Sequence, residues 1–187
     1  MGEYRLVESS VVAEGGFLTF VEEEFRGPDG EEFTRWIVRH PGAVAAVPVL
    51  DGGDTLLVRQ FRPAVRRFLL ELPAGKLDVP GEDPADAMAR ELVEEIGRRP
   101  GKLVKLVSFW NSPGFCTELT HVYVALDLEP CDGGEPAKAE ERDMTIERVP
   151  LADTGRLVAE GELVDSKSII GLLLAQRYLA GEQPAIP

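Results

Sequence analysis

Four glutamates and one arginine lie close together near the middle of the 187-residue chain. In a helix, Glu91 and Glu95 would lie one turn apart on the same face, with Glu94 beside them. Arg90 precedes Glu91, and Glu82 comes eight positions before Arg90. Grouped carboxylate oxygens are the ligands that Mg²⁺ and Mn²⁺ prefer, and these ions keep coordination positions for substrate phosphates. The spacing therefore indicates divalent-metal chemistry on a phosphorylated ligand.

A purely structural explanation of the same residues stays open at this level. Glu91 and Glu95 repel each other modestly at i and i+4, and a water-exposed acidic face would account for an isolated E-x-x-E-E pattern. Two upstream features favour a ligand site. Glu82 can reach back toward the same carboxylates, and Gly75 allows a loop backbone to approach a ligand closely. A loop carbonyl and these carboxylates together would make a partial shell for a divalent ion.

The element that carries these residues is predicted to be a helix from Pro84 to Ile96. Asp83 is suited to cap its first turn, and Pro84 is favoured at the first helical position. Gly97 is typical of the residue that ends a helix. The apolar residues recur every three or four positions and so form one stripe: Ala85, Met88, Ala89, Leu92 and Ile96.

Strands are predicted on both sides of this helix. The first 40 residues or so indicate an antiparallel unit, with a turn at 27–30 between strands at 17–25 and 33–38. A second hairpin is predicted from residues 43–50 and 55–61 around Asp51-Gly52-Gly53-Asp54. Further segments are predicted as strands at 104–110, 120–128 and 145–149, as helices at 151–160 and 166–180, and as a long polar loop at 131–144. The order indicates an α/β or α+β class with a mixed sheet.

The net charge of −13 limits the classes of partner. It argues against nucleic acid and against an anionic membrane, because both would repel most of this surface. About half of the excess acid lies in residues 82–95 and 135–143. Two cysteines make no disulfide framework, no signal segment is visible, and the longest apolar run, 169–175, is too short to span a membrane. A soluble cytoplasmic protein is expected.

The stretch from Gly75 to Arg98 resembles the Nudix box, whose pattern is G-x5-E-x7-R-E-U-x-E-E-x-G-U with U aliphatic. The chain fits the pattern from Glu82 through Gly97. It departs at two places: six residues rather than five separate Gly75 from Glu82, and Arg98 holds the last aliphatic position. The insertion falls in the turn at 78–81. The resemblance implies a Nudix α/β/α sandwich with a mixed sheet and an N-terminal antiparallel arm.

Segments outside the box are similar to the ADP-ribose pyrophosphatase branch of this family, namely 71–75, 112–115 and 161–167. Pro113 lies 16 positions after Gly97, at the place of a proline that marks the branch. The resemblance implies hydrolysis of ADP-ribose to AMP and ribose 5-phosphate with two or three Mg²⁺ ions, or Mn²⁺. Relatives commonly form homodimers with exchanged arms. The predicted division is therefore an arm of residues 1–40 and a Nudix domain of 41–187.

The resemblance also implies the catalytic machinery. The implied metal ligands are Ala74, through its carbonyl, and Glu82, Glu91, Glu94 and Glu95. Arg90 would orient these carboxylates by charge-assisted hydrogen bonds. The general base in this branch is usually a glutamate on a loop after the box, which favours Glu141. Glu140 and a base within the box stay open as alternatives.

The substrate contacts implied by the resemblance are Arg62, Glu71, Trp36, Pro113, Gly114, Phe115 and Glu118. Arg62 belongs to the segment 59–67, which carries four arginines and no acid. Arginine suits bidentate contact with phosphate. The aromatic residue that would stack on adenine is left open among Phe17, Phe20, Trp36 and Phe115. Glu118 could contact substrate or make a structural hydrogen bond.

Three alternative functions remain at the level of sequence. A Nudix pyrophosphatase for another nucleoside diphosphate derivative, such as a nucleotide sugar, would keep the same box. A non-catalytic Nudix-fold sensor of ADP-ribose or a nucleotide would normally lose box carboxylates or gain a DNA-binding domain. A structural or interaction protein would not need the box spacing. The retained carboxylates favour an enzyme.

Overall fold

The computed structural model describes residues 2–132 and 143–182, which form two compact units. One unit runs up to Gly42 and also includes Phe109–Leu119. The other unit holds the rest of the described chain, including α1, α2 and α3. The division expected near residue 40 lies close to this first boundary. The return of the later segment 109–119 to the first unit is not visible in the sequence.

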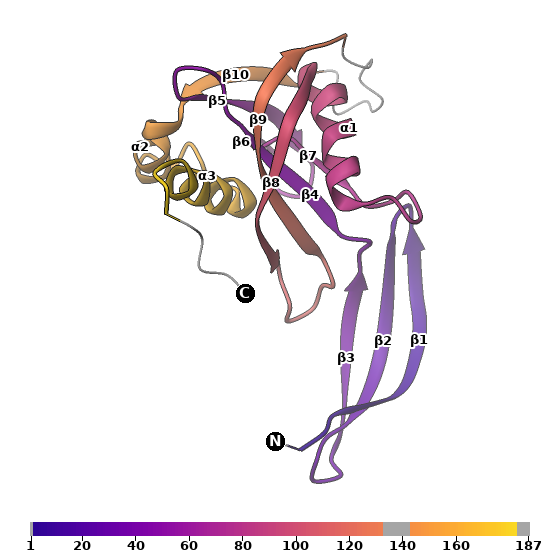
Figure 1. Ribbon diagram of the computed structural model, residues 1–187. Coiled ribbons are helices and arrows are strands. Elements are labelled where there is room, and N and C mark those ends of the chain that lie inside the picture. The colour runs from indigo at the N-terminus through magenta and orange to yellow at the C-terminus, as the bar shows by residue number, and fades with distance from the viewer. Residues whose placement is uncertain (1, 133–142, 183–187) are drawn as a thin grey trace. The chain divides into compact units, whose positions relative to one another are not determined.

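The first unit contains a three-stranded antiparallel sheet with β2 in the middle (Figure 1). Its strands are β1 (Arg5–Gly15), β2 (Leu18–Arg26) and β3 (Glu32–Arg39). Between β2 and β3, the amide of Gly30 donates to the carbonyl of Gly27 at 3.1 Å. Gly30 has φ +87°, a conformation that glycine adopts without steric cost. The turn predicted at 27–30 is confirmed.

The second unit contains two sheets, with strand orders β10-β5-β6 and β7-β4-β9-β8. The strands are β4 (Ala43–Pro48), β5 (Asp54–Arg62), β6 (Arg67–Glu71), β7 (Ala74–Lys76), β8 (Arg98–Trp110), β9 (Leu119–Pro130) and β10 (Thr145–Pro150). β4 runs parallel to β9 and antiparallel to β7, and all of its residues are buried. A strand covered on both faces is expected to be a continuous apolar run, as β4 is.

Helices α1 (Pro84–Ile96) and α3 (Ser166–Leu179) cover opposite faces of β4 (Figure 1). Val44 and Ala46 belong to the apolar cluster that includes the buried stripe of α1. Val47 instead faces Gly171 of α3, together with Leu72. Alternate residues of a strand point to opposite faces, so this pattern places one helix on each side.

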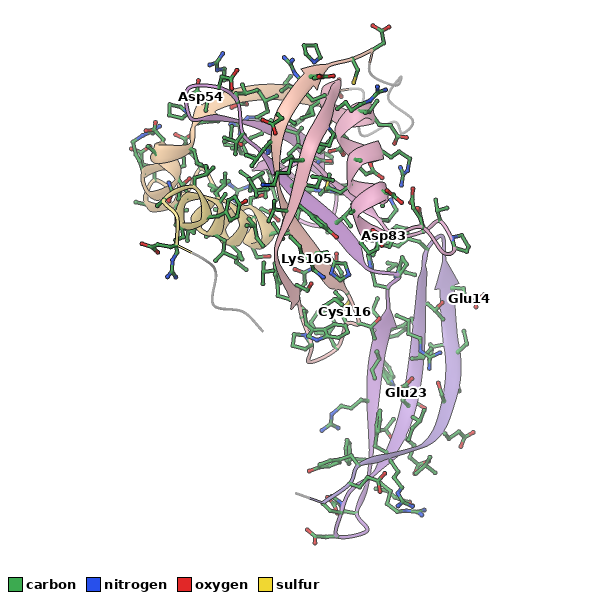
Figure 2. All side chains as sticks on the ribbon, in the orientation of Figure 1. Glu14, Glu23, Asp54, Asp83, Lys105 and Cys116 are labelled. Carbon is green, nitrogen blue, oxygen red and sulfur yellow. The ribbon has the colours of Figure 1, made fainter. Side chains whose placement is uncertain are left out.

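The predicted boundaries of α1 are confirmed. The side chain of Asp83 accepts a hydrogen bond from the amide of Ala85 at 2.8 Å (Figure 2). Pro84 is the first residue of the helix, and Gly97 ends it in the left-handed conformation at φ +60°. Capping residues act on adjacent backbone, so sequence alone determines these ends well.

The second predicted hairpin is wrong. β4 and β5 lie in different sheets, and the contact next to the turn is an isolated bridge between Val49, just after β4, and Thr55 of β5. The turn itself is present, since Gly52 and Gly53 both have positive φ. β4 needs partners on both edges because it is fully buried, and it finds them in β7 and β9. The chain therefore leaves the β7-β4-β9-β8 sheet before the turn and enters the β10-β5-β6 sheet as β5.

Two short strands and a change of helix type complete the corrections. β6 and β7 are not predicted by the sequence, and Ala74 lies in β7, paired with Ala45, rather than in a loop. The predicted helix 151–160 begins as a 3-10 turn (Leu151–Asp153) and continues as α2 (Thr154–Ala159). Within the described residues, no helix has the length and hydropathy needed to cross a membrane.

We predict that Gly171→Val lowers the free energy of unfolding by about 1–3 kcal/mol, because a side chain there overpacks the interface between α3 and β4. A Cβ at Gly171 would lie 2.7 Å from Leu72 and 3.0 Å from Val122. Gly155→Ala is the matched control, since a Cβ at Gly155 of α2 meets nothing within 4 Å. Urea titration measures both variants. Equal stability of the two would contradict tight packing at Gly171.

Candidate functional site

Arg90 holds the acidic face of α1 together. Its guanidinium donates to both carboxylate oxygens of Glu82 at 3.1 Å, to Glu91 at 2.8 Å and to Glu94 at 3.2 Å. The hydrogen bonds from Arg90 lower the pKa of Glu82, and the same carboxylates raise the pKa of Arg90 further. One cation therefore binds three neighbouring carboxylates and fixes their side chains.

Strand β7 supplies the second wall of this site. The backbone amide of Ala74 donates to Oε2 of Glu95 at 3.0 Å, so the strand fixes the fourth glutamate. At the next residue, Gly75, a Cβ would overlap the carboxylate and Cγ of Glu91. The glycine therefore leaves the space in which the Glu91 side chain lies. The structure brings Ala74, Gly75 and the glutamates of α1 together, as the resemblance implies.

The chemistry of this donor set fits a hard divalent cation, because carboxylate and carbonyl oxygens are the ligands of Mg²⁺ and Mn²⁺. In the described part of the chain, however, no three His, Cys, Asp or Glu side chains are arranged to hold an ion as they stand. In this arrangement Arg90 binds both oxygens of Glu82 and one oxygen each of Glu91 and Glu94.

Arg62, at the end of β5, is bound to a buried acid on β6. Its Nε and Nη2 donate to the two carboxylate oxygens of Glu71, both at 2.7 Å. The side chain of Glu71 is only 1% exposed and also accepts a hydrogen bond from Lys167 of α3. Burial alone would raise the pKa of Glu71, but the hydrogen bond from Arg62 and the charge of Lys167 outweigh it and lower that pKa. Glu71 is therefore an ionised support beneath Arg62.

The other arginines of the segment 59–67 differ from Arg62. Arg59 pairs with Glu147 of β10 at 2.5 Å, while Arg66 lies in a turn at φ +55° and Arg67 is exposed. The pKa of Arg62 is raised chiefly by its hydrogen bond to Glu71 and, to the smallest extent, by the charge of Glu95 on the acidic face. Of the four arginines, Arg62 is therefore the candidate for contact with the substrate.

The remaining substrate candidates belong to the first unit. Trp36 is 59% exposed, and its Nε1 donates to Glu22 at 2.5 Å. Phe115 is 57% exposed in the segment that also carries Pro113 and Gly114. Glu118 lies 3.9 Å from Nε2 of His40. Within the unit, Trp36 and Phe115 are thus open to a ligand, whereas Glu118 has a histidine neighbour. Glu140 and Glu141 lie outside the described residues.

Comparison with known proteins decides the family. The model of the NUDIX domain matches residues 39–169. The chain belongs to the Nudix family. An ADP-ribose pyrophosphatase of Mycobacterium tuberculosis (strain ATCC 25618 / H37Rv) is 38% identical over 96% of this chain and 86% of its own. An ADP-ribose pyrophosphatase of Bacillus subtilis (strain 168) is 35% identical over 93% of each chain.

A solved structure supports the fold of this Nudix chain. The crystal structure of an ADP compounds hydrolase superposes with a TM-score of 0.86, covering 97% of this chain and 96% of that one at 24% sequence identity. The predicted Nudix fold with a mixed sheet is confirmed.

The two departures from the Nudix box have local consequences. The additional residue is taken up in the turn before α1, where Gly81 has φ +79° and the amide of Glu82 donates to the carbonyl of Val79. Glu82 still meets Arg90 with both oxygens. Arg98, in place of an aliphatic residue, is half-buried at the start of β8. The insertion therefore leaves the contact of Glu82 with α1 in place.

Sequence reasoning missed Lys167 and Ser168 as residues near the site. The resemblance includes the segment 161–167 but implies no role for its residues. The available signal was local: Asp165 precedes a helix, and a residue that caps a helix places the next side chains at its N-terminus. Which strand this N-terminus meets depends on tertiary packing. The capping pattern does not specify it.

We predict that Gly75→Ala weakens binding of Mg²⁺ or Mn²⁺ by about tenfold or more, the range typical of changes beside metal ligands. The added Cβ would displace Glu91, whose flexible side chain can turn away without unfolding β7. Calorimetric titration with metal alone measures the affinity. Gly15→Ala, where a Cβ meets nothing within 4 Å, is the control. Unchanged affinity in Gly75→Ala would remove Glu91 from the metal shell.

Proposed function

We propose that this Nudix protein hydrolyses the diphosphate linkage of ADP-ribose to AMP and ribose 5-phosphate, with Mg²⁺ or Mn²⁺ as cofactor. The observation that carries the proposal is the acidic face of α1, which Arg90 and β7 hold opposite a glycine that leaves room for Glu91. The identity of 35–38% with two ADP-ribose pyrophosphatases across nearly the whole chain supports the choice of substrate.

The residues of the chain have separate tasks in this proposal. The carboxylates of Glu82, Glu91, Glu94 and Glu95 and the carbonyl of Ala74 would hold two or three divalent ions. Such ions, when bound, neutralise charge on the diphosphate oxygens and lower the pKa of the water that they coordinate. Arg90 keeps Glu82, Glu91 and Glu94 oriented. Arg62 would contact a phosphate oxygen of the substrate through the guanidinium donors that Glu71 does not use.

The proposed base is Glu141, with Glu140 as the alternative. It would accept a proton from the water that attacks one phosphorus of the linkage. The bond from that phosphorus to the bridging oxygen breaks, and the bridging oxygen leaves with the other phosphate group. One water is consumed, and both products are phosphate monoesters. The acidic segment from 135 to 143 supports a base in this part of the chain.

The proposed assembly is a homodimer in which the N-terminal arm of one copy completes the substrate site of the other. β1 supports this, because it is an edge strand whose residues are all exposed. Its exposed apolar residues include Leu6, Val7, Val11 and Val12. A long exposed edge with such residues favours pairing with another chain. Sedimentation velocity of the full chain measures the oligomeric state.

Product analysis tests the proposed reaction directly. Purified protein is incubated with ADP-ribose and Mg²⁺, and the products are separated by chromatography. Equal amounts of AMP and ribose 5-phosphate support the proposal. Absence of AMP at every Mg²⁺ or Mn²⁺ concentration would overturn it, and would favour a Nudix-fold sensor if ADP-ribose still binds. Faster turnover of a nucleotide sugar would shift the substrate to another nucleoside diphosphate derivative.

We predict that Glu95→Gln lowers kcat at least about a hundredfold, because a metal-ligating carboxylate supports several kcal/mol of transition-state stabilisation. We expect the fold to be retained, because the side-chain carbonyl oxygen of the glutamine can still accept the hydrogen bond from the backbone amide of Ala74. Asp86→Asn is the matched control on the same helix, where Asp86 is exposed in the first turn. Steady-state kinetics and circular dichroism measure both. A normal rate in Glu95→Gln would exclude Glu95 as a ligand.

We predict that Glu141→Gln lowers kcat by about 10²–10⁴-fold, the usual contribution of a general base. The adjacent Glu140→Gln is the matched variant, since it removes the same charge from the same segment. It should leave kcat nearly unchanged. The opposite result, a slow Glu140→Gln and a normal Glu141→Gln, would move the base to Glu140. Two normal rates would place the base within the box.

A further inference from the structure

Arg62 reaches the site with one edge of its guanidinium already occupied. Nε and Nη2 both donate to Glu71, and Nη1 makes no hydrogen bond to any described residue. The side chain remains 40% exposed, and the charge of Glu95 acts on it. A bidentate pair fixes the plane of a guanidinium, so Glu71 determines the direction in which the free donor points.

Glu71 is itself held by the N-terminus of α3. Lys167 donates to the Glu71 carboxylate and also pairs with Asp165 at 3.0 Å. Asp165 caps the helix by accepting from the amide of Ser168 at 3.0 Å. The hydroxyl of Ser168 accepts a hydrogen bond from the amide of Leu72, the residue after Glu71. α3 therefore contacts both the side chain of Glu71 and the backbone beside it.

We propose that Lys167 is a positioning residue that, through Glu71, orients Arg62 toward the diphosphate of the substrate. The inference rests on the proposed function, because it takes the diphosphate as the ligand of Arg62. Without Lys167, the buried Glu71 has one cationic partner instead of two. The Glu71 carboxylate can then turn with Arg62, and the direction of Nη1 is no longer determined.

Charge and burial favour positioning over direct contact of Lys167 with the ligand. The side chain of Lys167 is 13% exposed, and its ammonium lies between the carboxylates of Glu71 and Asp165. Arg62 is exposed three times as much, and its Nη1 binds no group in the described part of the chain. The four groups Arg62, Glu71, Lys167 and Asp165 have no net charge. The donor offered to an anion is therefore that of Arg62.

Lys167→Met removes the ammonium and keeps much of the side-chain volume. We expect KM for ADP-ribose to rise about tenfold or more, the equivalent of one misplaced hydrogen bond to a charged group, with kcat changed much less. Lys167→Arg should recover most of the loss. Lys102→Met is the control, since Lys102 is exposed on β8 and makes no ion pair with a described residue. Melting temperatures are recorded for all variants.

A double-mutant cycle separates positioning from general stability. The cycle compares the fold-increase in KM that Lys167→Met causes in the wild-type protein with the fold-increase that it causes in the Arg62→Lys variant. If Lys167 acts through Arg62, the increase is smaller in the Arg62→Lys variant. Independent, multiplying effects would overturn the proposal, as would a lower melting temperature with unchanged KM. If Lys167→Met does not fold, Lys167→Gln replaces it in the same cycle.

The substrate is tested separately in the same set of proteins. Affinity for α,β-methylene ADP-ribose, measured by calorimetry, reports binding without turnover. Wild-type protein that neither binds this analogue nor hydrolyses ADP-ribose would overturn the proposed function. Wild-type protein that binds it, with equal affinity in Lys167→Met, would overturn the positioning role alone.

Discussion

The repulsion among the carboxylates on and beside α1 is the constraint on which the site depends. Two like charges about 4 Å apart repel by roughly 1 kcal/mol in water and roughly 4 kcal/mol near a protein surface. Arg90 offsets this repulsion by binding Glu82, Glu91 and Glu94 at once. The apolar stripe of α1, packed against β4, and the cap at Asp83 keep the segment helical despite it. The same repulsion favours binding of a divalent cation.

Both helices that cover β4 meet the short segment between β6 and β7. From one side, Glu95 of α1 accepts from the amide of Ala74. From the other, Ser168 and Lys167 of α3 bind Leu72 and Glu71. The backbone from residue 71 to 75 is therefore fixed by polar contacts at nearly every position. It links the acidic face to Arg62, so the spacing between carboxylates and arginine follows from the packing of α1 and α3.

Local signals in the sequence predict α1 and its contact with Glu82, but they do not predict the partners of Glu71 or the pairing of β4. The caps of α1, the three- and four-residue spacing of its apolar stripe and the contact of Glu82 with Arg90 each relate residues at most eight positions apart. One partner of Glu71, Lys167, is 96 residues away, and β4 pairs with β9 over a separation nearly as long, with Ala43 opposite Thr120. The hairpin predicted from Gly52-Gly53 failed for this reason: a turn brings two strands close, but burial on both faces decides which strands pair.

The distribution of charge indicates that cation and substrate bind interdependently under the proposed function. Arg62 is offset by Glu71, and Lys167 by Asp165, so the ion network adds no net positive charge. The acidic face carries four glutamates against Arg90 alone. A diphosphate would be repelled by that face until divalent ions neutralise it, and its oxygens would complete the coordination of those ions. Because coupling between binding sites is reciprocal, each ligand must raise the affinity for the other. The negative charge that argues against nucleic acid as a partner would then make substrate binding depend on the metal.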